Sequence, residues 1–183
     1  VEQLHAPPWL PSVCVALLTI TSSTLTLAAV HLTQTRSRAF AVGLGVTILL
    51  AWILTMVAIH FLPASYVTAA LIVATLIFAI GSLLIGTRLN AAANDAAPPS
   101  QRGKYLATFQ YAFSIASLVA PLLLTAFAFA TWLPWAILSL TLAIALVLLP
   151  LLRRTLPERV LGARPAEPVS YTHLRAHETP EHL

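Results

Sequence analysis

Three long runs without a single aspartate, glutamate, lysine or arginine limit what this chain can fold into. They cover residues 3–35, 39–87 and 105–152. A soluble domain carries charged side chains on its outer surfaces, whereas a helix that spans a bilayer needs about 20 consecutive apolar residues. Only 9 % of the residues are charged, where a soluble domain has roughly a quarter. The sequence therefore predicts a membrane protein.

The three runs divide into five predicted spanning helices, so the predicted fold class is an all-α membrane protein. The runs are continuous and do not alternate between polar and apolar residues, which argues against barrel strands. In lipid every backbone amide must find its partner within the segment, and a helix meets this requirement. The predicted spans are residues 10–32, 39–62, 65–87, 105–129 and 133–152.

The basic residues predict how these helices are oriented. Every lysine and arginine up to Arg154 falls at alternate ends of the five spans, and by the positive-inside rule these ends face the cytoplasm. These residues are Arg36, Arg38, Arg88, Arg102, Lys104, Arg153 and Arg154. Four aromatic residues of the kind that prefers the membrane interface then lie at the outer face. They are Trp9, Tyr66, Trp132 and Trp135.

The two ends of the chain carry separate expectations. Residues 1–9 are predicted to form an external loop before the transmembrane portion, residues 10–156. An outward N-terminus requires a signal sequence or a preceding helix, so we expect this chain to be the C-terminal part of a longer protein. Residues 157–183, rich in proline and mixed charge, predict a disordered cytoplasmic tail. Its last part, VSYTHLRAHETPEHL, resembles translated read-through of a sequencing adapter, so residues 169–183 are interpreted as artefactual.

Polar side chains follow one face of three predicted helices, while the second and fifth helices are mostly apolar all round. At about 100° per residue the hydroxyls of the first helix share a narrow sector, and the fourth helix has a similar row. Small polar residues also allow helices to pack closely, so each row fits either a packing surface or a substrate path. The candidate cavity residues are Thr19, Ser22, Ser23, Thr26, Thr75, Gln110, Ser114 and Ser117. Gln110 is the largest of them.

Groups that catalyse reactions are missing from the pattern. No predicted span contains an ionised residue of the kind that couples transport to protons or ions. No nucleophile is paired with a base, and no cluster has metal-ligand spacing. Gly43 and Gly45 lie inside a helix, where close packing explains them better than a phosphate loop. We therefore predict no enzyme activity, no cofactor and no metal site. The basic loops follow from membrane topology and do not indicate nucleic-acid binding.

The stretch NDAAPPSQRGKYLATFQYAF, residues 94–113, is the place where charge and proline meet the start of an apolar run. Its pattern begins with Asp95 and continues with Pro99-x-x-Arg102-Gly103. A helix with an aromatic and small-residue face follows and runs to Ala120-Pro121. This pattern resembles the cytoplasmic loop between the tenth and eleventh helices of major facilitator superfamily transporters, especially drug-efflux-like bacterial members. The resemblance covers about residues 9–156.

The resemblance implies that the five helices are the eighth to twelfth of twelve. The helices with polar rows would then face the central cavity or the interface between halves, and the two apolar helices would face lipid. One departure concerns the loop HLTQTRSRAF, which keeps Arg36 and Arg38 but lacks the acidic residue common there in the family. The resemblance therefore does not by itself imply a gating contact in that loop.

The same resemblance implies a function. It indicates a fragment of a secondary active transporter in the plasma membrane that exports a small molecule by alternating access with proton coupling. Its partners would be the lipid bilayer, the missing N-terminal half and a small-molecule substrate. Arg102 has two possible roles. It forms a latch with Asp95 or with a carboxylate of the missing half, or it only anchors the topology. Ser100 is expected to cap the next helix.

A second interpretation is a self-contained five-helix membrane subunit with an interaction or structural role. The coding sequence upstream of Val1 distinguishes the two.

Overall fold

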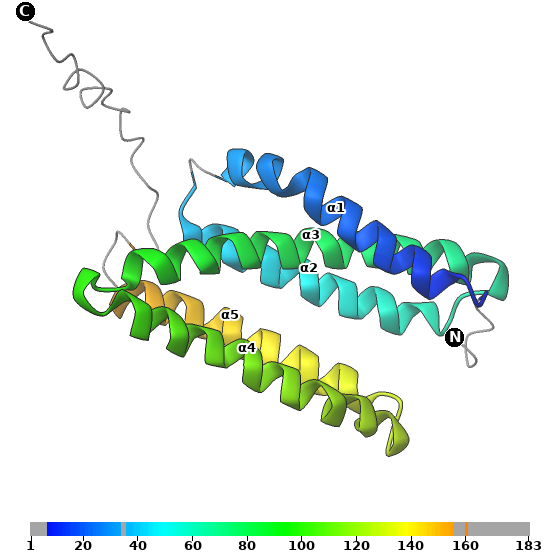
Figure 1. The fold of residues 1–183 in the computed structure, drawn as a ribbon. Coiled ribbons are helices and arrows are strands. Elements are labelled where there is room, and N and C mark those ends of the chain that lie inside the picture. The colour runs from blue at the N-terminus through cyan, green and yellow to red at the C-terminus, as the bar shows by residue number, and fades with distance from the viewer. Residues whose placement is uncertain (1–6, 34–35, 156–159, 161–183) are drawn as a thin grey trace, which may run out of the picture.

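The computed structural model describes residues 7–33, 36–155 and 160. This part of the chain forms five long helices that alternate in direction (Figure 1). All five are long and apolar enough to cross a membrane, which confirms the predicted all-α fold class. The helices are α1 (Leu10–Thr33), α2 (Arg38–Ile59), α3 (Ala64–Ala96), α4 (Arg102–Thr125) and α5 (Leu133–Thr155). Residues 1–6 of the predicted loop, and the predicted tail apart from Val160, lie outside the described residues.

The alternation of direction places the basic residues together. We call the end of the bundle that holds Arg36, Arg38, Arg88, Arg102, Lys104, Arg153 and Arg154 the basic end; it lies at the left of Figure 1. The opposite end, with Trp9, Tyr66, Trp132 and Trp135, is the aromatic end. The separation of the two residue classes that the sequence predicts is therefore present in the fold.

Helix α3 is longer than its predicted span. It contains 33 residues and ends at Ala96, whereas the hydropathy pattern stops at Thr87. At 1.5 Å per residue this helix is about 50 Å long, against a hydrocarbon core of about 30 Å. The additional residues, RLNAAANDA, are rich in alanine, which favours helix even where the sequence is polar. Hydropathy locates the span, but the helix continues beyond it.

The connection from α3 to α4 differs from its prediction in one detail. Pro98 and Pro99 stop the helix as expected, because proline lacks the amide donor and restricts the residue before it. A short 3₁₀ turn, η2 (Pro99–Gln101), then precedes α4. Ser100 lies inside this turn, so the prediction that it caps α4 is wrong. The N-cap residue is Gln101, and its side chain forms no capping hydrogen bond.

The centre of the fold is the interface between α2 and α3, where two glycines meet. A Cβ atom added at Gly45 would lie 2.9 Å from the carbonyl oxygen of Gly81, and one added at Gly81 would lie 3.1 Å from that of Gly45. The two backbones are therefore in direct contact, as small residues allow in membrane helices. Gly43 faces α5, where an added Cβ would lie 3.3 Å from Leu149. The interpretation of Gly43 and Gly45 as close-packing residues is confirmed.

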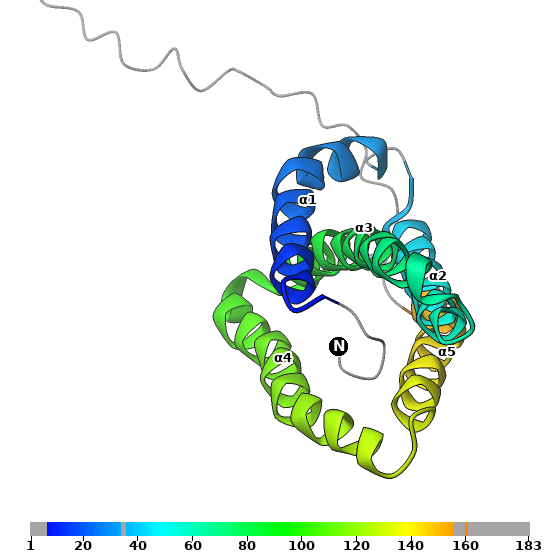
Figure 2. The ribbon, with the colours of Figure 1, turned by 90° about the vertical axis from the view of Figure 1, so that its right-hand side faces the viewer.

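The other helices pack around this pair unequally. Helix α1 packs on α3, and α5 packs on α2. Helix α4 meets α3 near their connection but buries none of its own residues within the described part of the chain. Figure 2 shows α4 and α5 diverging from the turn that joins them, with α4 well apart from α2. That turn contains a short 3₁₀ segment, η3 (Ala126–Ala128). Helix α4 is thus the helix least covered by its own chain.

Candidate functional site

The predicted cavity residues lie on surfaces that this chain leaves largely uncovered. On α4 the side chains of Gln110, Ser114 and Ser117 are all exposed. On α1 the row is exposed at Thr19 and Ser23 and half-buried at the two remaining positions, Ser22 and Thr26. Thr75, the candidate on α3, is half-buried. The structure therefore presents these polar rows to the surroundings of the described chain and does not bury them in its core.

Most of these hydroxyl groups donate to their own helix. The oxygen acceptors are four residues earlier in the chain: Val15 for Thr19, Leu71 for Thr75 and Phe113 for Ser117, each at 2.9 Å. Thr26 donates to the carbonyl of Ser22, and Ser114 to that of Gln110 at 3.5 Å. This local bond satisfies the hydroxyl donor without a second helix. The lone pairs of each hydroxyl oxygen stay able to accept a hydrogen bond from a ligand.

Gln110 differs from the hydroxyl residues. Its side-chain amide forms no hydrogen bond with the part of the chain that the structure describes, and it projects from an exposed position on α4. An amide has two donors and an acceptor that lipid cannot satisfy. Of the candidates, Gln110 therefore has the strongest requirement for a partner beyond the described residues.

Two pockets of the described chain, one at each end of the bundle, are lined by residues other than those of the polar rows. The substrate-path interpretation of the rows on α1, α3 and α4 stays a prediction.

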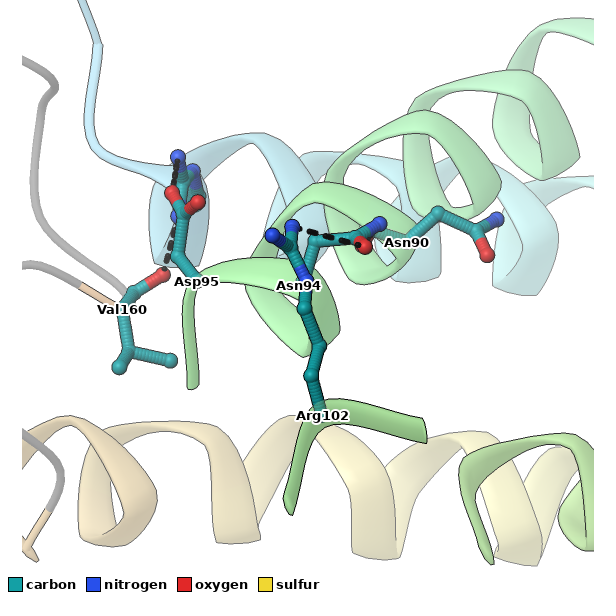
Figure 3. Close-up of polar contacts among 6 residues, drawn as sticks. Asn90, Asn94, Asp95, Arg102 and Val160 are labelled. Atoms are coloured by element: carbon teal, nitrogen blue, oxygen red, sulfur yellow. Dashed lines mark hydrogen bonds and ion pairs between the residues drawn. The ribbon is translucent and has the colours of Figure 1, made fainter. Parts of the chain in front are cut away.

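At the basic end, an ion pair connects α2 to α3. The guanidinium of Arg38 lies 2.5 Å from the carboxylate of Asp95 and also donates to the carbonyl oxygen of Val160 at 2.9 Å (Figure 3). The side chain of Arg38 is 6 % exposed and that of Asp95 is 32 % exposed. Val160 is buried against Ala39 and Ala92. Arg38 thus holds α2, α3 and a residue beyond α5 together.

A second arginine connects α3 to α1. The guanidinium of Arg88 donates to the hydroxyl of Thr33, with a distance of 2.9 Å from Nε, and to the carbonyl oxygen of Val30 at 2.9 Å. Val30 and Thr33 lie in the last turn of α1, where helical carbonyls have no partner within the helix. A cation is favourable at this end of a helix because the helix dipole is negative there. Arg88 therefore stabilises the C-terminus of α1.

The loop motif is arranged differently from its prediction. Asp95 is paired with Arg38, whereas the side chain of Arg102 lies 3.5 Å from the side-chain oxygen of Asn94 (Figure 3). Of the alternatives considered for Arg102, the pair with Asp95 is not formed in the structure, and Arg102 contacts the neighbouring residue, Asn94. Successive helical residues are about 100° apart, so Asn94 faces the start of α4 while Asp95 faces α2.

The structure also describes the other two motif residues, Pro99 and Gly103. Pro99 opens the 3₁₀ turn before α4. A Cβ atom added at Gly103 would meet nothing within 4 Å among the described residues. A latch between Arg102 and a carboxylate outside this chain stays untested.

A pocket at the aromatic end was not predicted. It has a volume of about 450 Å³ and lies between the end of α2 and the start of α5. Its walls include His60, Phe61, Trp132 and Trp135. Tryptophan residues were expected here as interface anchors. Their position beside His60 and Phe61, which follow α2, was not predicted because the two segments are far apart in the sequence. The pocket is mainly apolar and open to the surroundings.

Comparison with known proteins gives one match. The model of the Major Facilitator Superfamily matches residues 1–179, a range that includes all five helices and the motif between α3 and α4. No curated protein and no solved structure gives a significant match to the chain.

Proposed function

Because this chain belongs to the major facilitator superfamily, whose members are membrane transporters, we propose that it forms the eighth to twelfth helices of a secondary transporter in the plasma membrane. The transporter moves a small molecule by alternating access, in which one bundle of helices rocks against the other around a site near the middle of the membrane. The proposed direction is efflux, and the proposed driving force is a proton gradient. Proton-carrying carboxylates would lie in the N-terminal half, since the five spans have none in their apolar runs.

The main observation that supports this proposal is the exposure of α4. Helix α4 buries none of its residues against the described chain, yet it carries Gln110, Ser114 and Ser117 on one face. Lipid leaves the amide of a glutamine unsatisfied at a cost of several kcal/mol. This face is therefore matched to another set of helices or to an aqueous path, and a transporter made of two halves supplies both.

The basic end supports an orientation. We propose that it faces the cytoplasm, because lysine and arginine accumulate in cytoplasmic loops. The C-terminal end of α5, which carries Arg153 and Arg154, would then be cytoplasmic as well. Cysteine labelling from outside the cell, at single positions near each end, tests this assignment. Labelling of positions at the basic end in intact cells would contradict it.

Transport by the whole protein is the direct test. The complete reading frame that contains this chain is expressed in cells that lack their own efflux pumps, and accumulation of a cationic fluorescent dye is measured with and without an uncoupler. We expect lower accumulation that the uncoupler reverses. A panel of dyes and uncharged drugs is used, because the substrate is unidentified. Absence of transport for the whole panel, with normal insertion, counts against efflux.

The coding sequence distinguishes the alternative. Seven further helices in frame upstream of Val1 support the twelve-helix transporter. A start codon immediately before Val1, together with a stable oligomer of the five-helix chain, would favour the self-contained membrane subunit instead.

A further inference from the structure

A groove at the basic end runs between α1 and α2 with α3 as its floor. It has a volume of about 420 Å³ and is almost entirely apolar, with Leu25 from α1, Leu44 and Ile48 from α2, and Ile80 and Leu83 from α3 in its walls. Leu25, Leu44 and Ile80 each keep between 39 % and 40 % of their surface exposed. In a membrane such a groove does not stay empty, because it is filled by a hydrocarbon chain or by another helix.

The mouth of this groove carries positive charge. Arg36 is part of its wall, and its guanidinium lies 5.8 Å from the centre of the Phe40 ring, another wall residue. Thr33, which also lines the groove, accepts from Arg88. An anion at the mouth would therefore meet one exposed arginine and a second arginine just behind it.

The local charges do not cancel. Arg36, Arg38 and Arg88 bring three positive charges to the cytoplasmic ends proposed for α1, α2 and α3, while Asp95 brings one negative charge that is already paired with Arg38. Arg88 is held by Val30 and Thr33. Among the described residues, the side chain of Arg36 contacts the face of the Phe40 ring, which accepts none of its N–H donors in a conventional hydrogen bond. These donors form a fork that fits phosphate oxygens.

The length of the groove fits one leaflet. From Phe40 to Ile48 helix α2 rises about 12 Å at 1.5 Å per residue, and one leaflet of a hydrocarbon core of about 30 Å is about 15 Å deep. A chain that enters beside Arg36 and follows α2 to Ile48 would thus extend through most of one leaflet. The arginine at the membrane surface corresponds to the phosphate group of a phospholipid, and the apolar walls beneath it correspond to the acyl chain.

We propose that this groove is a binding site for an anionic phospholipid of the leaflet at the basic end. One acyl chain lies between Leu25 and Leu44 over the floor formed by Ile80, and the phosphate group accepts hydrogen bonds from Arg36. Bound in this way the lipid bridges α1 and α2, each of which packs on α3. The inference is independent of the substrate and direction of transport.

Native mass spectrometry of the purified full-length chain in detergent tests the proposal. The protein is offered equal amounts of phosphatidylglycerol and phosphatidylethanolamine with identical acyl chains, and the fraction that retains each lipid is measured. We expect preferential retention of one phosphatidylglycerol molecule. Arg36→Gln removes the phosphate contact, and because one cation near a membrane surface is worth about 1 kcal/mol we expect retention to fall about fivefold. Arg153→Gln removes an exposed arginine from the same end and is expected to have no effect.

A second pair of variants tests the groove itself. Ala28 is an exposed residue of its wall, so Ala28→Phe places a ring where the acyl chain would lie and should abolish retention of both lipids. Ala143→Phe adds the same ring at an exposed position of α5 and is expected to leave retention unchanged. Equal retention of the two lipids, equal losses in Arg36→Gln and Arg153→Gln, or full retention in Ala28→Phe would each overturn the proposal. Loss of both lipids from the unaltered protein would also overturn the proposal and would indicate that another helix covers the groove.

Discussion

Arg38 and Asp95 are 57 residues apart in the sequence, yet their side chains meet at 2.5 Å and join α2 to α3 at the basic end. The second nitrogen of the guanidinium donates to the carbonyl oxygen of Val160. Neighbouring Arg88 connects α3 to α1. Two arginines therefore hold three of the five helices together just where the apolar spans end.

Asp95→Asn should destabilise the protein, because it removes the charge partner of an arginine that is 6 % exposed. The expected loss is about 1–3 kcal/mol of unfolding free energy, the penalty for an unsatisfied buried polar group. Thermal unfolding of the purified protein, followed by tryptophan fluorescence, measures it. Arg153→Gln, at an exposed position, is the control and should change little. If Arg38→Gln and Asp95→Asn prove additive when combined, the two side chains are not coupled.

Gly45→Ala should weaken the interface between α2 and α3. The added Cβ would lie 2.7 Å from Cγ1 of Ile85 and 2.9 Å from the carbonyl oxygen of Gly81, and overpacking of this kind costs about 1–3 kcal/mol. Gly86→Ala is a matched control on α3, because its Cβ would meet nothing within 4 Å. It should be neutral or stabilise the helix by up to about 1 kcal/mol. The reverse order of stability between the two variants would contradict the packing described here.

Arg88→Lys should loosen the end of α1 while the charge is kept. An ammonium group cannot reproduce the donors with which the guanidinium reaches both Thr33 and Val30. Hydrogen bonds to a charged group are worth about 1.5–3 kcal/mol, so amide exchange in the last turn of α1 should become at least about tenfold faster. Hydrogen–deuterium exchange with peptide-level detection measures the rate. Arg154→Lys serves for comparison, and unchanged exchange in Arg88→Lys would show that the cation alone is sufficient.

Gln110→Leu should reduce transport by the complete protein more than it reduces stability. The amide forms no hydrogen bond with the described chain, so its partner is expected in the cavity or in the other half. Loss of one hydrogen bond worth about 1.4 kcal/mol lowers transport about tenfold. Thr141→Val on α5 is the comparison, because Thr141 donates only to the carbonyl of its own helix at Ile137. Equal transport by both variants would remove Gln110 from the proposed cavity.

Arg102→Ala separates a latch from a topology anchor. Arg102 is exposed, and within the described chain its side chain forms one hydrogen bond, of 3.5 Å, with Asn94. The free energy of unfolding should therefore change by less than about 0.5 kcal/mol. If Arg102 closes a gate with a carboxylate of the other half, transport falls although the protein inserts normally. Lys104→Ala controls for the loss of one positive charge. Full transport by Arg102→Ala would leave the anchor as its role.

The sequence predicted the membrane class and the number of helices because charge-free runs reflect the cost of charge in lipid, which acts on each segment separately. It did not predict where α3 ends, since alanine-rich polar residues extend a helix without any hydropathy pattern. It also did not predict the pairing of Asp95 with Arg38, for a different reason. The choice between Arg38 and Arg102 depends on which face of α3 meets α2, and this is set by the contact of Gly45 with Gly81, which only the packed helices reveal.

That contact also bears on movement. Between Gly45 and Gly81 no layer of side chains separates the two backbones, so one helix cannot slide along the other without breaking contact between main-chain atoms. Shear motions are a small sliding of packed helices past one another, and this contact opposes such sliding. We therefore expect α2 and α3 to move together as one rigid body. Displacement within this chain is then concentrated at residues 97–101, where prolines interrupt the backbone and α4 has little packing to lose.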